Sequence, residues 1–194
     1  MIIGITGGTG SGKSTMLRLI AEHGGEIFDC DAIYHELLTR DHALTEAIEA
    51  RFPGVVEEGS LNRKKLGAVV FADAQALLDL NAITHAAVKN EVLRRLETAP
   101  KLAAIDAIGL FEGHLAELCH VTVAVTAPVE DRVKRLMARD GISEDYARSR
   151  ITAQHDEQWF ADRCDHLLEN DGSFDAFATK CVAFLRKIGI INSN

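Results

Sequence analysis

Short apolar runs alternate along the chain with longer amphipathic segments. The apolar runs have the length and the Ile, Val, Leu and Ala content of strands that are buried on both faces of a sheet. We expect such strands at Ile2–Thr6, Gly25–Asp29, Ala103–Ala107, Val121–Val125 and Asp165–Glu169. This alternation is typical of an α/β fold, with a mostly parallel sheet flanked by helices.

The amphipathic segments have the spacing of apolar residues that indicates helices. They are Lys13–His23, Ala32–Ala50, Arg63–Phe71, Gln75–Glu97, Glu130–Arg139, Glu144–Gln154 and Phe174–Lys187. The stretch from about 32 to 100 contains no convincing strand and is too long for one crossover, so it predicts a helical insertion at the sheet edge. A second helical excursion, from about 128 to 160, is interpreted as a lid and is called the lid segment below. We expect residues 1–194 to form a single domain with these two excursions.

A glycine-rich segment follows the first expected strand. Residues 7–14, GGTGSGKS, match the pattern G-x-x-x-x-G-K-[ST], and a helical pattern begins directly after them. In this context the pattern forms a P-loop, whose backbone N–H groups and following helix N-terminus bind phosphates. The alternative is a glycine-rich turn that carries Lys-Ser by coincidence. The residues expected to hold the nucleotide are Gly8, Thr9, Gly10, Ser11, Gly12, Lys13, Ser14 and Thr15.

The P-loop implies ATP or GTP as the ligand, together with Mg²⁺. Lys13 supplies a mobile cation for the β- and γ-phosphate oxygens, and Ser14 offers its hydroxyl to the metal ion. Because kinases, switches, motors and transport ATPases share this loop, the residues after the other strands must decide the function.

Acidic residues follow the expected strands at the edge where the P-loop lies. Ligands of open parallel sheets bind beyond the carboxyl ends of the strands, so Asp29, Asp31 and Asp106 are expected to converge on the phosphates. Asp31 is either a catalytic residue or the N-cap of the helix expected near Ala32. Asp29 is interpreted as structural. Asp106 either holds a magnesium-bound water or caps a turn.

Basic residues are concentrated in the lid segment, where Arg132, Arg135 and Arg139 share one helix face. They are placed to meet phosphates when a lid closes. The alternative is an ordinary solvated face held by weak pairs four positions apart, namely Glu130 with Lys134 and Asp131 with Arg135. Arg139 has no acid at that spacing, so it is the arginine that we expect to bind the phosphates.

Composition and charge narrow the class of partner. Hydrophobic residues make up 47% and charged residues 26%, as in soluble globular proteins. A net charge of -8 argues against nucleic acid as a partner. The four cysteines and eight histidines show no spacing typical of a disulfide framework or a metal site. Without a basic leader or a long apolar span, we expect a cytoplasmic protein that does not bind membranes.

Several segments together resemble the dephospho-CoA kinase family, whose members use ATP to phosphorylate the ribose 3′-hydroxyl of dephospho-CoA. The resemblance covers nearly the whole chain. It rests on residues 4–15, Asp29-Cys30-Asp31 where the family has Asp-Ala-Asp, Leu80-Asn81 with His85, Leu110-Phe111-Glu112, Arg135-Leu136, Arg139-Asp140-Gly141, residues 147–154 and Asn170-Asp171-Gly172.

The resemblance implies a role for several residues of this chain. Asp31 becomes the base for the 3′-hydroxyl, His85 and the Phe111-Glu112 corner become candidates for binding dephospho-CoA, and Arg139 becomes a lid residue on ATP. From the residues alone, a surface role for His85 is favoured over contact with an acceptor phosphate. Asn170 resembles part of the loop beside the adenine.

The chain departs from the family pattern at three places. Ile108-Gly109 stands where Pro-Leu is usual, Ala86 where Pro follows the histidine, and Phe160 where a basic residue is frequent. These departures leave the expected chemistry intact and affect the shape of the acceptor site and the lid contacts.

The resemblance implies a monomeric P-loop kinase that acts on dephospho-CoA. A nucleoside or nucleotide kinase is the nearest rival, since it shares the P-loop, lid and insertion. A nucleotide-dependent switch or assembly factor is a rival of another class. The compact basic lid favours phosphoryl transfer, because a lid excludes water.

Overall fold

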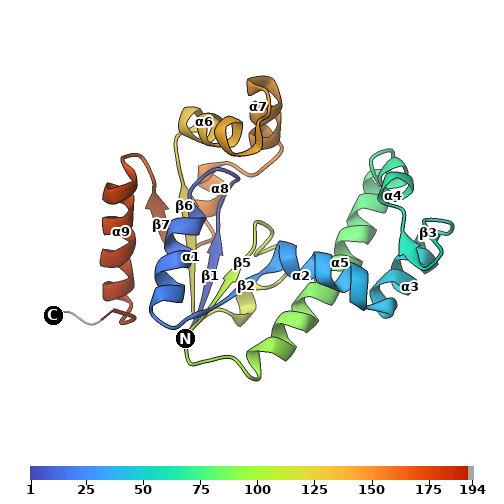
Figure 1. Cartoon of the computed structure of the whole chain (residues 1–194), viewed down its shortest axis with the longest axis horizontal. Helices are drawn as coiled ribbons and strands as arrows, with labels where there is room; N and C mark the ends of the chain where they lie inside the picture. The colour runs from blue at the N-terminus through green and yellow to red at the C-terminus, as the bar shows by residue number, and fades with distance from the viewer. Residues whose placement is uncertain (192–194) are drawn as a thin grey trace.

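The computed structural model describes residues 1–191, which are built around one five-stranded parallel sheet (Figure 1). Its strands are β1 (Ile2–Thr6), β2 (Glu26–Asp29), β5 (Ala103–Asp106), β6 (Val121–Thr126) and β7 (His166–Glu169). They lie in the order β2-β5-β1-β6-β7, each parallel to its neighbours. All five strand predictions are confirmed, and the α/β class is therefore correct.

Helices cover both faces of the sheet. On one face α1 (Lys13–Glu22) and α9 (Phe174–Lys187) pack against side chains such as Ile3 and Ile5. On the other face α2 (Cys30–Arg40), α5 (Ala74–Leu96) and the 3-10 helix η1 (Ala116–Leu118) pack against side chains such as Ile105. This burial fixes the strand register, because successive side chains of a strand point to opposite faces.

The insertion between β2 and β5 reaches away from the sheet (Figure 1). It contains α2, α3 (His42–Arg51), a hairpin of β3 (Val56–Glu57) and β4 (Ser60–Leu61), α4 (Arg63–Val70) and α5. The prediction of one helix over 32–50 is wrong, because Asp41 adopts an extended backbone that ends α2 and caps α3 through Ala43 N–H. The expectation that this stretch holds no strand is also wrong.

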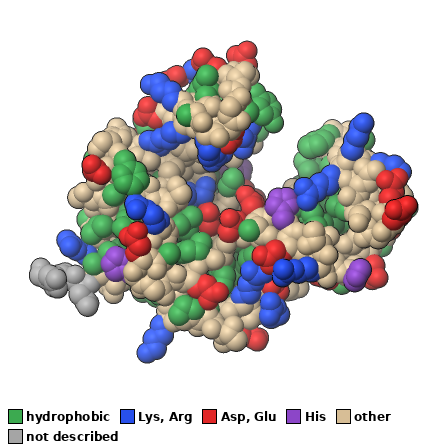
Figure 2. Space-filling model, in the orientation of Figure 1, with side chains coloured by type: hydrophobic (Ala, Val, Ile, Leu, Met, Phe, Trp, Pro, Cys, Tyr) green, Lys and Arg blue, Asp and Glu red, His purple; other side chains and the backbone are tan. Residues whose placement is uncertain are grey.

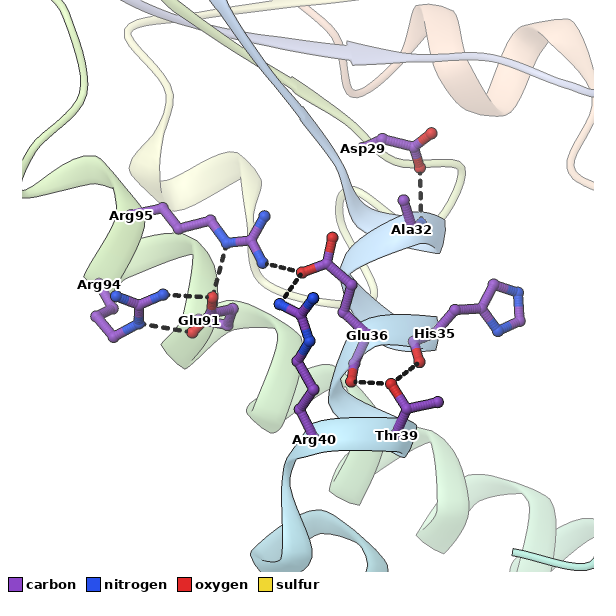
Figure 3. Close-up of polar contacts among 9 residues, drawn as sticks. All are labelled: Asp29, Ala32, His35, Glu36, Thr39, Arg40, Glu91, Arg94 and Arg95. Atoms are coloured by element: carbon purple, nitrogen blue, oxygen red, sulfur yellow. Dashed lines mark hydrogen bonds and ion pairs between the residues drawn. The ribbon is translucent and has the colours of Figure 1, made fainter. Parts of the chain in front are cut away.

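A cluster of charged residues fastens α2 to α5 (Figure 3). Arg95 donates to Glu36 on α2 at 2.6 Å and to Glu91 on its own helix at 2.7 Å. Hydrogen bonds from Arg94 and Arg95 lower the pKa of Glu91 to about 2. These bonds fix the relative position of the two helices that carry Asp31 and His85.

The lid segment contains α6 (Val129–Asp140), α7 (Glu144–Thr152) and the short α8 (Glu157–Ala161), and α6 and α7 lie above the carboxyl ends of the strands (Figure 1). Helices α6 and α7 enclose a small hydrophobic core of their own, formed by Val133, Leu136, Ala147 and Ile151. None of the helices within residues 1–191 is long and apolar enough to cross a membrane.

Ion pairs also tie α6 to α7. Arg148 binds Glu130 at 2.8 Å, and Arg150 binds Asp140 at 2.7 Å. The predicted pairs of Glu130 with Lys134 and Asp131 with Arg135 are wrong. Glu130 turns to α7, Asp131 lies 3.9 Å from Lys134, and Arg135 points to the P-loop.

Candidate active site

The P-loop, residues 7–14, joins β1 to α1 through a tight turn. Gly12 has a φ of 106° and serves as the N-cap of α1. Gly7 has a φ of 130°, and a side chain there would overlap the Val125 carbonyl oxygen. These two positions require glycine, because L side chains rarely adopt such backbone angles.

Lys13 is half-buried at the start of α1. Its Nζ donates to the Gly7 carbonyl at 3.0 Å, so the side chain folds back over the loop. Burial lowers the pKa of Lys13, while the nearby carboxylates of Asp106 and Asp31 raise it. The lysine is therefore a cation held between a phosphate-binding loop and two acids.

The three predicted acids come together beside the loop. Asp29 ends β2 and pairs in register with Asp106 at the end of β5. Asp29 is the N-cap of α2, since its Oδ1 accepts from Ala32 N–H at 3.0 Å. The reading of Asp31 as N-cap is therefore wrong. Asp31 lies exposed in the first turn of α2, where its carboxylate is not used by the cap.

Asp106 has a distinct environment. Burial, helped by Asp29 and Asp31, raises its pKa to about 6, although Lys13 opposes the shift. Its Oδ1 is buried and makes no hydrogen bond within residues 1–191. A buried carboxylate oxygen without a partner is costly, and a cation or a donor would stabilise it.

Two cavities meet at Asp31. The larger, of about 390 Å³, is lined by the P-loop, by Asp29 and Asp106, and by arginines of the lid segment. The smaller, of about 170 Å³, lies between α2, α5 and the loop after β5, and His85 is among its lining residues. Asp31, Ala107 and Ile108 line both cavities. Figure 2 shows the hollow between the lid segment and the insertion, with acidic side chains on its floor.

The acceptor candidates divide into two groups. His85 lines the smaller cavity with Asp31, and its Nδ1 lies 3.2 Å from the Glu112 carbonyl oxygen. The side chains of Phe111 and Glu112 turn instead toward the lid segment. Glu112 binds His155 at 2.7 Å, and the rings of Phe111 and Trp159 form a T-shaped pair at a centroid distance of 5.7 Å.

Arg139 lines the larger cavity, but its guanidinium is held by a neighbour. Its Nε and Nη2 donate to the two carboxylate oxygens of Asp140 at 2.7 and 2.9 Å. Arg150, which sequence reasoning missed, lines the same cavity and binds the same carboxylate. The two arginines lower the pKa of Asp140 to about 2.

Other predicted nucleotide-binding residues lie outside the larger cavity. Gly8 lies beneath Arg132 and Gln154, and Thr15 is buried within α1. Asn170 is buried behind the loop, where its Nδ2 donates to the Ser11 carbonyl at 2.8 Å. Thr9, Gly10, Ser11, Gly12, Lys13 and Ser14 line the cavity as expected.

Arg135 is the main residue that sequence reasoning assigned elsewhere. It lines the larger cavity and donates to the carbonyls of Gly10 and Ser11 at 3.1 and 3.2 Å. The spacing of Arg135 from Arg132 and Arg139 on one helix face was the signal for it.

A parallel sheet with a P-loop after β1, carboxylates beside that loop and a basic helical segment above it defines a nucleotide-dependent kinase of the P-loop class. The family model for dephospho-CoA kinase matches residues 1–176. The chain belongs to the dephospho-CoA kinase family. Members of this family use ATP as their co-substrate.

Individual relatives agree with this assignment. The dephospho-CoA kinase of Carboxydothermus hydrogenoformans is 35% identical over 192 residues, which cover 96% of this chain and 93% of the relative. A crystal structure of a Thermus thermophilus protein, 34% identical, superposes with a TM-score of 0.80 over 97% of each chain. The dephospho-CoA kinase from Campylobacter jejuni, 24% identical, has the same fold, with a TM-score of 0.68 over 96% of each chain.

Proposed function

We propose that this protein transfers the γ-phosphoryl group of ATP to the ribose 3′-hydroxyl of dephospho-CoA, giving coenzyme A and ADP. The observation that carries the proposal is the position of Asp31, where the P-loop cavity meets the smaller cavity. A donor phosphate on the loop and a hydroxyl in the smaller cavity would meet at this carboxylate. Placing two reactants together in this way is a major part of phosphoryl-transfer catalysis.

Asp31 is proposed as the general base. In the reaction, the 3′-oxygen forms a bond to the γ-phosphorus as the bond to the β,γ-bridging oxygen breaks, and the hydroxyl proton passes to Asp31. The carboxylate is exposed in the first turn of α2 and is not engaged by the helix cap, so it is available to accept that proton.

Lys13 is proposed to stabilise the phosphates through its positive charge. It sits at the N-terminus of α1, where the helix dipole adds to the same potential. As charge moves from the γ-phosphoryl group toward the bridging oxygen, a positive charge at this place would stabilise the transition state.

The residues at the loop also suit Mg²⁺. Asp106 offers a buried carboxylate oxygen that has no partner among residues 1–191, and Ser14 offers an exposed hydroxyl at the start of α1. Mg²⁺ prefers such oxygen ligands and binds through one or two of them together with substrate phosphates. We propose that Ser14 holds the ion directly and Asp106 through water; the bound ion would neutralise phosphate charge.

His85, with the Phe111-Glu112 corner behind it, is proposed to shape the acceptor side. The lid segment is proposed to close over ATP, with Arg139 on the phosphates and Asn170 on the adenine side. We further propose that residues 1–194 act as a single monomeric, cytoplasmic kinase domain without a nucleic acid or membrane partner.

Product identification tests the proposal. The protein is incubated with Mg²⁺, ATP and, separately, dephospho-CoA, nucleosides and nucleoside monophosphates, and the products are identified by mass. We expect phosphorylation of dephospho-CoA, with fragmentation placing the new phosphate on the 3′-oxygen. Phosphorylation of a nucleoside or nucleotide instead would identify the rival kinase class, and ADP release without a phosphorylated acceptor would identify a nucleotide switch.

A further inference from the structure

The outer side of the P-loop is bound by side chains from the base of the lid segment. Arg132 Nε donates to the Thr9 carbonyl at 2.9 Å, and Gln154 Oε1 accepts from Thr9 N–H at 2.8 Å. Arg132 Nη2 also donates to Gln154 Oε1 at 3.0 Å. Thr9 is thus held through both of its backbone polar groups by two side chains that bind each other.

These two side chains come from the two places where the lid segment joins the sheet. Arg132 lies in the first turn of α6, and Gln154 follows the end of α7. Because α6 and α7 share a hydrophobic core and two ion pairs, a movement of the lid would displace both side chains. The backbone of the loop is therefore mechanically connected to the lid.

The contacts also set the direction of the loop's peptide groups. In a trans peptide the carbonyl and the following N–H point in opposite directions. The bond from Arg132 to Thr9 C=O therefore turns Gly10 N–H to the other side of the loop. Bonds from Arg135 and Asn170 to Ser11 C=O do the same for Gly12 N–H.

Backbone donors on the inner side remain unused. Within residues 1–191, the N–H groups of Gly10, Gly12, Lys13 and Ser14 make no hydrogen bond. Such converging donors bind phosphate oxygens. The hydrogen bonds that side chains donate to the loop carbonyls thus leave these backbone N–H groups oriented to bind an anion.

The charge of Arg132 is also uncompensated. It is half-buried, and it forms no ion pair with an acid among residues 1–191, in contrast to Arg148, which binds Glu130 and Glu144. Burial lowers the pKa of Arg132, and its positive charge lowers the pKa of Lys13. The guanidinium therefore adds to the positive potential at the loop.

We propose that Arg132 and Gln154 are positioning residues for ATP, which hold the Thr9 peptide so that the P-loop presents its unbonded N–H groups to the polyphosphate. Because both residues belong to the lid segment, they make the shape of the loop depend on the position of the lid. This inference rests on the proposed binding of ATP at the P-loop.

The test compares Arg132→Ala, Arg132→Lys and Gln154→Ala with the control Lys134→Ala, which removes one positive charge from an exposed position of the same helix. ADP binding is measured by calorimetry, and KM for ATP and for dephospho-CoA by steady-state kinetics. We expect Arg132→Ala to raise the Kd for ADP and the KM for ATP about tenfold, as for the loss of a hydrogen bond from a charged donor. The KM for dephospho-CoA should change less than about twofold.

The conservative and double variants give independent readouts. Arg132→Lys should restore only part of the affinity, because one ammonium does not reproduce the fork of the guanidinium. Gln154→Ala should weaken ADP binding without a change in charge. The double variant Arg132→Ala, Gln154→Ala should be no weaker than the worse single variant, since the two residues act as a unit.

Three results would overturn the inference: ADP binding unchanged in both Arg132→Ala and Gln154→Ala, equal weakening in Lys134→Ala, or equal increases in both KM values. Failure of the unmodified protein to bind ADP would instead contradict the proposed function. Thermal unfolding of each variant verifies that it is folded before its affinity is compared.

Discussion

Lys13 combines three features at the scale of a single residue: burial, a hydrogen bond to Gly7 and two nearby carboxylates. Lys13→Ala should lower kcat/KM by a factor of about 10² or more, the effect of losing a preorganised charge at the transferred phosphoryl group. Lys134→Ala, at an exposed lysine of the lid segment, is the control and should leave activity nearly unchanged. Near-normal activity of Lys13→Ala would remove the P-loop from the catalytic account.

Asp106 makes the free energy of unfolding of the ligand-free protein depend on pH. Its pKa is raised to about 6 in the folded protein, whereas that of an unfolded Asp is about 3.9. The folded protein therefore binds the proton more tightly, so this group lowers the free energy of unfolding as pH rises from about 4 to about 6. At pH 7 the ionised Asp106 is destabilising.

Asp106→Asn should remove that dependence. Between pH 5 and pH 7, the free energy of unfolding of the unmodified protein should fall by about 1 kcal/mol relative to the variant. The variant should also need more Mg²⁺ for activity. Denaturant unfolding at the two pH values and a Mg²⁺ titration of the rate measure both effects. Parallel pH profiles of the two proteins would contradict the assignment.

At the scale of elements, the lid segment behaves as a unit because α6 and α7 have their own core. Arg139 projects from this unit into the larger cavity, with Asp140 as its partner. Arg139→Ala should weaken ATP binding or lower kcat, and should change the free energy of unfolding by less than about 0.5 kcal/mol, because an exposed residue makes few stabilising contacts. A variant that unfolds easily yet retains full turnover would show that the pair with Asp140 is only structural.

The sequence was sufficient for the elements whose signals are long or chemically specific. Buried strands, long helices and the P-loop each carry such a signal. The break at Asp41 was missed because the apolar spacing continues across it. The β3–β4 hairpin has two residues in each strand, too few for an alternating pattern, and its turn depends on Glu58 and Gly59 in left-handed conformations.

The site was harder to predict, because it depends on contacts between distant segments. The Asp29-Cys30-Asp31 sequence identified the acids, but a helix start shifted by two residues moved the cap from Asp31 to Asp29. The ordinary rule of pairing four positions apart misplaced Arg135, whose acceptors are backbone carbonyls far away in the sequence. Every residue has a backbone carbonyl, so residue types do not indicate which carbonyl accepts a hydrogen bond.

At the scale of the whole molecule, three parts surround one hollow. The sheet supplies the P-loop and Asp106, the insertion supplies Asp31 and His85, and the lid segment supplies the arginines. The bonds of Arg95 connect the insertion helices to each other. The hydrogen bonds of Arg132 and Gln154 to the Thr9 backbone connect the lid segment to the P-loop. The arrangement brings donor and acceptor cavities together at Asp31.

The rate of Asp31→Asn, with Asp29→Asn as its matched control, tests this account most directly. Both changes remove one negative charge beside the loop, and Asn at position 29 still caps α2. If Asp31 accepts the 3′-hydroxyl proton, Asp31→Asn should lower kcat by about 10²- to 10⁴-fold with an unchanged Tm. Asp29→Asn should lower kcat by less than about tenfold, because it removes charge without removing the base. An Asp31→Asn protein with normal stability and nearly full activity would contradict the account.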